Sequence, residues 1–335
     1  MLGVPNSNGA DMAGRHRIVQ ANGVRHHLVE EGEGPLVLMV HGFPESWYSW
    51  RYQLPALAAA GYRAVAIDVR GYGRSYKPSA VDGYRMVKHV GDIVDLVSVL
   101  GADRAVLVGH DWGAPIVWNS ALLSPDRFAG VAGLSVPYSA PRPLTGPSPT
   151  AGMRADESSG EFYISYFQEV GRAETEIEQD VRDWLLGFYY CASGDVTNGP
   201  NISRVDHGKQ LRDKFVYPDT LPSWLTEADL DVYAGEFEHS GFFGGLSRYR
   251  NVDRDWEDLA PWAGRPIEIP SMFVGGSKDG PTVWGGPAIN RFPETLPALY
   301  KSEIIEGSGH WIQQERADET NALLIEFLDQ LELGR

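Results

Sequence analysis

The segment that most constrains this chain spans residues 106–118, where an apolar run leads into a Gly-His-Asp-Trp-Gly turn and then into a helical pattern. Glycine stands on both sides of the turn, at Gly109 and Gly113, as closely approaching backbone requires. A strand that passes through such a tight turn into a helix raises one side chain above the carboxyl edge of its sheet. The raised residue here is Asp111.

An aspartate at this place changes the chemistry that the turn can support. A carboxylate is already ionised at neutral pH, so it can attack a carbon directly and form an alkyl ester. The electrophile should then be a carbon that bears a leaving group, as in an epoxide or an alkyl halide. The backbone N–H of Trp112 would bind an oxyanion when water attacks the ester. The pentapeptide by itself is equally compatible with a tight turn that carries a solvated aspartate.

The chain before residue 137 alternates strand and helix patterns. Buried strands are predicted at 36–40, 64–69, 106–110 and 128–136, helices at 52–60 and 85–100, and a hairpin at 17–29 around Asn22-Gly23. This order indicates an α/β chain with a parallel sheet and right-handed crossovers.

The pattern changes abruptly after residue 136. Linker-like composition over 137–160 is followed by aromatic-rich helical segments, such as 173–190 and 227–240, before strands resume at 270–276 and 302–305 and a helix closes the chain at 317–333. We therefore predict a leader over 1–14, a sheet domain formed by 15–140 and 257–335, and an inserted helical cap over 141–256.

An ester on Asp111 can be hydrolysed only if water is activated, and a histidine oriented by a carboxylate is the usual base. In enzymes built on such a turn, nucleophile, acid and histidine follow in this order, each after a strand of the sheet. Asp279 follows the strand at 270–276, and His310 follows the strand at 302–305. We predict Asp279 as the orienting acid and His310 as the base.

A second turn follows the strand at 36–40 and begins His41-Gly42-Phe43. Its position predicts that the Phe43 N–H lies beside that of Trp112, so that the two form an oxyanion hole. His41 and His110 belong to these two turns, and we expect both to be buried structural partners.

Composition excludes several classes of function. A net charge of −16 disfavours nucleic acid and anionic membrane surfaces as partners. A single cysteine, Cys191, allows no intrachain disulfide and no cysteine-based metal site. The first residues carry no apolar run of signal-peptide length, and no stretch approaches the ~20 apolar residues of a spanning helix, so we expect a cytoplasmic protein. The hydrolysis expected at Asp111 needs no metal and no other cofactor.

With these residues in view, the chain resembles the epoxide hydrolases of the α/β-hydrolase superfamily, most of all bacterial members, from about Arg17 onward. Residues 41–47 match the oxyanion motif of the family, 109–113 match its nucleophile turn, and Asp279 and 309–311 match its acid and histidine positions. The resemblance implies a mostly parallel central sheet with helices on both faces and an inserted helical cap.

The family also carries two cap tyrosines that donate hydrogen bonds to the epoxide oxygen. Residues 162–169 and 247–251 resemble the segments that hold them, which places the donors at Tyr163 and Tyr249. Ring opening creates an alkoxide, to which a phenol of pKa ~10 gives a proton far more readily than water does. Tyr166 would share a helical face with Tyr163 and is the nearest alternative.

The resemblance implies conversion of an epoxide and water to a vicinal diol, by an enzyme that can be a homodimer. Detoxification, lipid-epoxide turnover and natural-product biosynthesis are all compatible with this reaction. A haloalkane dehalogenase would share the aspartate nucleophile and Trp112, but such enzymes typically have asparagine or tryptophan where this chain has Phe43. Fluoroacetate dehalogenases carry phenylalanine there, but usually have arginine at the position of Trp112. A non-catalytic ligand-binding relative would be expected to lack part of the triad.

Overall fold

The computed structural model describes residues 14–197, 199–331 and 333. The predicted leader over 1–14 therefore lies outside the described residues, apart from Gly14. An eight-stranded sheet has the order β1-β2-β4-β3-β5-β6-β9-β10. Its strands are β1 (Arg15–Ala21), β2 (Val24–Glu31), β3 (Leu36–Val40), β4 (Arg63–Ile67), β5 (Ala105–His110), β6 (Phe128–Leu134), β9 (Ser271–Gly276) and β10 (Leu299–Ile305).

The sheet is parallel from β4 to β10, while β1 and β2 join it as an antiparallel hairpin. Asn22 and Gly23 connect the hairpin and both have positive φ, of 49° and 75°. A two-residue turn with positive φ at both positions suits the right-handed twist of the flanking strands. The predicted hairpin and the predicted parallel sheet are both confirmed.

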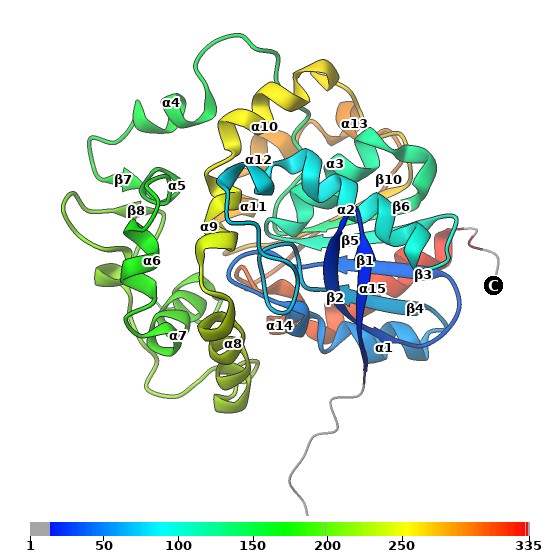
Figure 1. Ribbon diagram of the computed structural model, residues 1–335, viewed down its shortest axis with the longest axis horizontal. Coiled ribbons are helices and arrows are strands. Elements are labelled where there is room, and N and C mark those ends of the chain that lie inside the picture. Colours follow the sequence, from blue (N-terminus) through cyan, green and yellow to red (C-terminus); the bar gives the residue numbers. More distant parts are fainter. Residues whose placement is uncertain (1–13, 198, 332, 334–335) are drawn as a thin grey trace, which may run out of the picture.

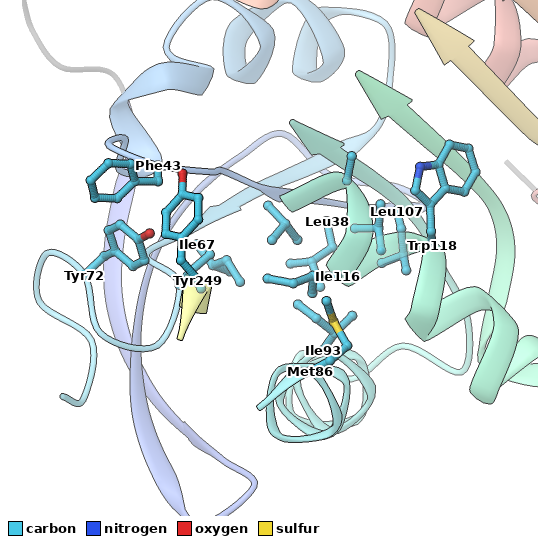
Figure 2. Close-up of a cluster of buried hydrophobic side chains, with 14 of the residues drawn as sticks. Leu38, Phe43, Ile67, Tyr72, Met86, Ile93, Leu107, Ile116, Trp118 and Tyr249 are labelled. Atoms are coloured by element: carbon cyan, nitrogen blue, oxygen red, sulfur yellow. The ribbon is translucent and has the colours of Figure 1, made fainter. Parts of the chain in front are cut away.

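Helices cover both faces of the sheet. On one face lie α2 (Met86–Val99) and α3 (Gly113–Leu123), and on the other lie α1 (Gln53–Ala59) and α15 (Ala317–Gln330). Alternate residues of β3 explain this division, because Leu38 and Val40 pack in the first cluster and Val37 and Met39 in the second. Figure 2 shows Leu38 among side chains from α2 and α3.

Short elements connect the main layers. They are the 3₁₀ turns η1 (Trp47–Trp50), η2 (Val81–Tyr84), η3 (Pro125–Arg127), η4 (Leu211–Lys214) and η5 (Ala260–Trp262), and the helices α11 (Gly280–Trp284), α12 (Gly286–Ile289), α13 (Phe292–Thr295) and α14 (Ile312–Glu315). The predicted closing helix is α15, which ends at Gln330 rather than at 333.

A helical insertion separates β6 from β9. It contains α4 (Pro149–Arg154), β7 (Glu161–Phe162), α5 (Tyr163–Tyr166), α6 (Arg172–Ile177), α7 (Val181–Ala192), β8 (Arg204–Val205), α8 (Glu227–Ser240), α9 (Phe243–Tyr249) and α10 (Val252–Leu259). Figure 1 shows α5 to α8 gathered to one side of the sheet, with α9 between α6 and the sheet. The boundaries of the cap at 141 and 256 stay a prediction.

The segment predicted as one helix over 173–190 consists of two helices. α6 ends at Ile177, and α7 begins after Asp180, whose side chain accepts a hydrogen bond from the Asp183 N–H. Aspartate caps a helix in this way because its carboxylate satisfies an otherwise unpaired backbone donor. Among the described residues, no helix has the length and apolar character needed to cross a bilayer.

Candidate active site

Asp111 stands at the carboxyl end of β5 with a φ of +50°, in the left-handed region that non-glycine residues seldom adopt. The close approach of neighbouring backbone holds it there. A Cβ atom on Gly113 would lie 1.9 Å from the Val40 carbonyl oxygen, and one on Gly42 would lie 2.3 Å from Asp111 Oδ1. These positions accept only glycine, which explains the glycines around the turn.

The two carboxylate oxygens of Asp111 have different partners. The Phe43 N–H donates to Oδ1 at 2.7 Å, and His310 Nε2 lies 3.5 Å from Oδ2. Burial raises the pKa of Asp111, but the hydrogen bond and charge of His310, together with the Phe43 N–H, outweigh it and hold the pKa below its ordinary value. Asp111 is therefore ionised at neutral pH.

His310 lies between two carboxylates. Its Nδ1 is 2.8 Å from Asp279 Oδ1, on the opposite side of the ring from Asp111. Burial lowers the pKa of His310, but the charge of Asp279 and hydrogen bonds to Asp111 and Asp279 outweigh this effect, so the pKa stands well above its ordinary value. The structure thus brings together the three residues that the sequence placed after separate strands.

Two further side chains contact Asp279 and His310, and sequence reasoning missed both. Thr282 Oγ1 lies 2.7 Å from Asp279 Oδ2, and its N–H donates to the same oxygen at 3.3 Å. Ser135 Oγ lies 3.1 Å from His310 Nδ1. Thr282 could have been found from the sequence. Aspartate is a common N-cap residue, and the side chain of an N-cap contacts the residue three positions later, which for Asp279 is Thr282. Ser135 carries no comparable signal beyond its place after a strand.

His110 and Glu45 form a second buried pair beneath the first. His110 Nδ1 is 2.7 Å from Glu45 Oε2, and His110 Nε2 is 2.7 Å from the carbonyl oxygen of His310. Both partners are acceptors, so both ring nitrogens donate and His110 is an imidazolium. The Gly42 N–H also donates to Glu45 within the same turn, and the two contacts of His110 link the loops that follow β3, β5 and β10.

His41 holds the neighbouring turn. Its Nδ1 donates to the Gly42 carbonyl oxygen at 2.8 Å, and its Nε2 accepts from the Val69 N–H at 3.0 Å. One nitrogen donates and the other accepts, so this ring is neutral, and burial accordingly lowers the pKa of His41. The expectation that His41 and His110 are buried structural partners is confirmed.

A cavity of about 290 Å³ opens at the nucleophile turn, and Asp111, His310, Tyr163 and Tyr249 all line it. The two tyrosine rings have their centroids 5.9 Å apart, and that of Tyr249 lies 5.4 Å from that of Phe43 (Figure 2). Burial, followed by the negative charge of Asp111, raises the pKa of both phenols well above the ordinary value. Both tyrosines therefore keep their protons in the resting site.

Comparison with known proteins agrees with this geometry. A family model described as alpha/beta hydrolase fold matches residues 35–169. Epoxide hydrolase B of Mycobacterium tuberculosis is 46% identical, across 93% of this chain and 98% of that protein. The chain belongs to the epoxide hydrolases of the α/β-hydrolase fold. Epoxide hydrolase 1 of Siraitia grosvenorii is a more distant relative at 38% identity, across 94% of this chain and 98% of that one.

Solved structures give the same family. An epoxide hydrolase from an endophytic Streptomyces is 58% identical with a TM-score of 0.91, covering 94% of this chain and 95% of the other. Epoxide Hydrolase A from Mycobacterium thermoresistibile is 43% identical with a TM-score of 0.88, covering 96% and 100%. The dehalogenase and the non-catalytic relative weighed as alternatives find no support among these.

Packing in this epoxide hydrolase separates Tyr163 from Tyr166. The Tyr166 ring is fully buried, and its hydroxyl donates to the Glu176 carboxylate inside the cap. Tyr166 is absent from the lining of the cavity, whereas Tyr163 lies in it with Asp111. The nearest alternative donor therefore has a different partner, although the catalytic roles themselves stay predictions.

The second tyrosine of this epoxide hydrolase is held against the sheet domain by its neighbour Arg248. The guanidinium of Arg248 is buried 4.9 Å from the centre of the Trp112 ring, pairs with Asp255 and donates to the Tyr84 carbonyl oxygen. The Tyr249 ring packs edge-on against Trp112 at 5.1 Å. Helix α9 thus fixes Tyr249 relative to the nucleophile turn.

No metal site accompanies these groups in the part of the chain that the structure describes. Within residues 14–197, 199–331 and 333, no cluster of three or more His, Cys, Asp or Glu side chains has a metal-binding arrangement.

Proposed function

We propose that this epoxide hydrolase converts an epoxide to a vicinal diol through an ester on Asp111. The observation that carries the proposal is that the two carboxylate oxygens of Asp111 have different partners. Oδ1 is held by the Phe43 N–H, and Oδ2 lies toward His310 without that anchor. Oδ2 is therefore the oxygen that attacks, and Oδ1 becomes the carbonyl oxygen of the ester.

In the first step Asp111 Oδ2 forms a bond to a ring carbon, the C–O bond of the ring breaks, and its electron pair stays on the epoxide oxygen. Tyr163 and Tyr249 donate hydrogen bonds to this oxygen, and one phenol transfers its proton. The charge of Asp111 is one cause of the raised pKa of both phenols, and esterification removes that charge. The tyrosines consequently become stronger acids at the moment when the alkoxide forms.

In the second step His310 acts as the base. The charge of Asp111 also contributes to the raised pKa of His310, so the pKa falls once the ester exists and the ring can lose its proton to the tyrosinate. Neutral His310, oriented by Asp279, then takes a proton from water as that water attacks Asp111 Cγ.

The oxyanion that forms on Asp111 Oδ1 is stabilised by the Phe43 and Trp112 N–H groups. Collapse of this intermediate releases the diol, which leaves with the proton that His310 took from water. The reformed carboxyl group of Asp111 returns its own proton to His310, and the resting ion pair is restored.

The test is the intact mass of the His310→Gln variant after exposure to an aryl epoxide and, separately, to a chloroalkane. We expect a mass gain equal to the whole epoxide, located on Asp111 by peptide mapping, because removal of the base leaves alkylation possible and blocks hydrolysis. His239→Gln, on the exposed face of α8, is the matched control and should show no adduct. An adduct formed only from the chloroalkane, with loss of halide, would contradict the proposal.

We further propose that the enzyme is a cytoplasmic homodimer. The support is the similarity to bacterial members of the family. Light scattering on the purified protein should give twice the mass of 36.9 kDa, and a value equal to one chain would contradict the dimer.

A further inference from the structure

The backbone on both sides of His310 is held by one carboxylate, that of Glu315 at the end of α14. The Gly309 N–H donates to Glu315 Oε2 at 2.8 Å, and the Trp311 N–H donates to Oε1 at 2.9 Å. These two residues directly precede and follow His310 in the chain. Glu315 therefore fixes the main chain from which the proposed base projects.

The same carboxylate also binds the cap. Its Oε2 accepts a second hydrogen bond at 2.9 Å, from the N–H of Gly194, which lies two residues beyond the end of α7. The cap in turn binds the loop directly, because the His310 N–H donates to the Ala192 carbonyl oxygen at 2.9 Å. Lys278, beside Asp279, donates to the Gly194 carbonyl oxygen at 2.6 Å. The end of α7 is thus attached to the loops of both the base and the orienting acid.

Backbone meets backbone at this contact, and glycines make the approach possible. A Cβ atom on Gly309 would lie 2.2 Å from the Gly194 nitrogen, and one on Gly194 would lie 2.2 Å from the Gly307 carbonyl oxygen. Ala192 and Ser193 of the same cap segment also line the cavity described above. A segment packed so closely cannot shift without moving the loop, so one stretch of chain is both a wall of the cavity and a support of the base.

The hydrogen bonds at this contact require a carboxylate. Three N–H groups point at the two oxygens of Glu315, and an ionised carboxyl group only accepts hydrogen bonds. An amide would present a donor of its own to at least one of the three. Burial raises the pKa of Glu315 above its ordinary value, although the hydrogen bonds from the three N–H groups oppose this effect. The fold therefore keeps an acidic group where burial disfavours its charge.

We propose that Glu315 is a positioning residue for His310, which sets the place of the base relative to the ester on Asp111 by joining the His310 loop to the end of α7. The inference rests on the proposed function, because it takes His310 as the base of the second step. Hydrolysis requires His310, a water molecule and Asp111 Cγ in one geometry, whereas alkylation requires Asp111 and the two tyrosines. Loss of the Glu315 carboxylate should therefore slow the second step and spare the first.

The experiment measures both steps of Glu315→Gln in single-turnover kinetics with styrene oxide. Glutamine keeps the size of the side chain but places an amide NH₂ against at least one of the three N–H donors. We expect ester hydrolysis to slow by about 10-fold or more, since a misplacement of about 1 Å can cost about 100-fold, and alkylation to stay within about 3-fold of wild type. Intact mass during turnover should accordingly show a larger fraction of enzyme that carries the whole epoxide.

Glu319→Gln makes the same chemical change at an exposed position of α15 and is the matched control, with both rates expected to equal those of wild type. Glu315→Asp retains the charge and both acceptor oxygens on a side chain one methylene shorter, so hydrolysis should slow less than in Glu315→Gln. The aspartate variant also supplies the comparison of the two steps if Glu315→Gln does not fold.

Three outcomes would overturn the inference: equal slowing of alkylation and hydrolysis, hydrolysis at the wild-type rate in folded Glu315→Gln, or slower hydrolysis in Glu315→Asp than in Glu315→Gln. Equal slowing of both steps is what a contact that only stabilises the fold would give. Failure of the proposed function has a different result, because the wild type would then form no ester on Asp111 and His310→Gln would gain no mass from styrene oxide.

Discussion

Glu45 and His110 form a fully buried ion pair beneath the proposed catalytic loops, and Glu45→Gln should reveal its contribution to stability. The amide keeps the shape of the carboxylate but removes its charge, so His110 is left either as an unpaired buried cation or as a neutral ring with one donor fewer. In the second case the introduced amide N–H can donate to His110 Nδ1, but the Gly42 N–H, which donates to the same carboxylate oxygen in the wild type, then loses its acceptor.

The expected loss follows from this burial. Removing one partner of a buried ion pair costs roughly 3–5 kcal/mol, and because glutamine retains one acceptor we expect about 3 kcal/mol. For domains of roughly 150–250 residues, 1 kcal/mol corresponds to about 2–4 °C in Tm, so the longer chain here should lose about 6 °C. Calorimetry at neutral pH measures this difference, with exposed Glu306→Gln as the control.

The same variant makes a prediction about pH. Burial raises the pKa of Glu45, but the charge and hydrogen bond of His110 outweigh it, so the pKa in the folded state lies below the ordinary value of 4.5. A lowered pKa contributes stability above the unfolded value, and this stability is lost as pH falls through the folded value. The Tm difference between wild type and Glu45→Gln should therefore shrink below about pH 4.5. A Tm within about 1 °C of wild type at neutral pH would refute the reasoning.

Further predictions concern the proposed oxygen donors and the hydrogen bond between Thr282 and Asp279. Tyr163→Phe and Tyr249→Phe should each slow alkylation by about 100-fold, the cost of removing one donor to a developing oxyanion, as measured by rapid quench. Tyr166→Phe should leave alkylation within about 3-fold of wild type, and an effect as large as that of Tyr163→Phe would contradict the assignment. Thr282→Val should slow ester hydrolysis more than alkylation, by about 10-fold, because Asp279 loses about 1.4 kcal/mol of orienting hydrogen bond. Equal slowing of both steps in single-turnover kinetics would count against this.

The sequence by itself determined the features that depend on neighbouring residues. The continuous apolar run at 36–40 predicts a strand covered on both faces, and Asn22-Gly23 predicts the hairpin, because the relevant constraints act within a few residues. The glycines around Asp111 likewise predict the tight turn between β5 and α3. The family resemblance supplied the tyrosines, which composition could not have selected among 15.

Local patterns were misleading where a capping interaction divides a segment predicted to be helical. The segment 173–190 was expected as an aromatic-rich helical segment, yet α6 ends at Ile177 and the Asp180 side chain caps a new helix, α7. Periodicity reports which faces are apolar and does not report where the backbone hydrogen bonds are interrupted.

Only the tertiary structure decided which groups meet at the candidate site. Glu45 and His110 are 65 positions apart and His110 and His310 are 200 apart, so their hydrogen bonds exist only because β3, β5 and β10 end at one edge of the sheet. Packing within the cap likewise directs Tyr166 to Glu176. The cavity that Asp111 lines is a space between elements distant in the chain, and a space between packed surfaces has no signature in the order of the residues.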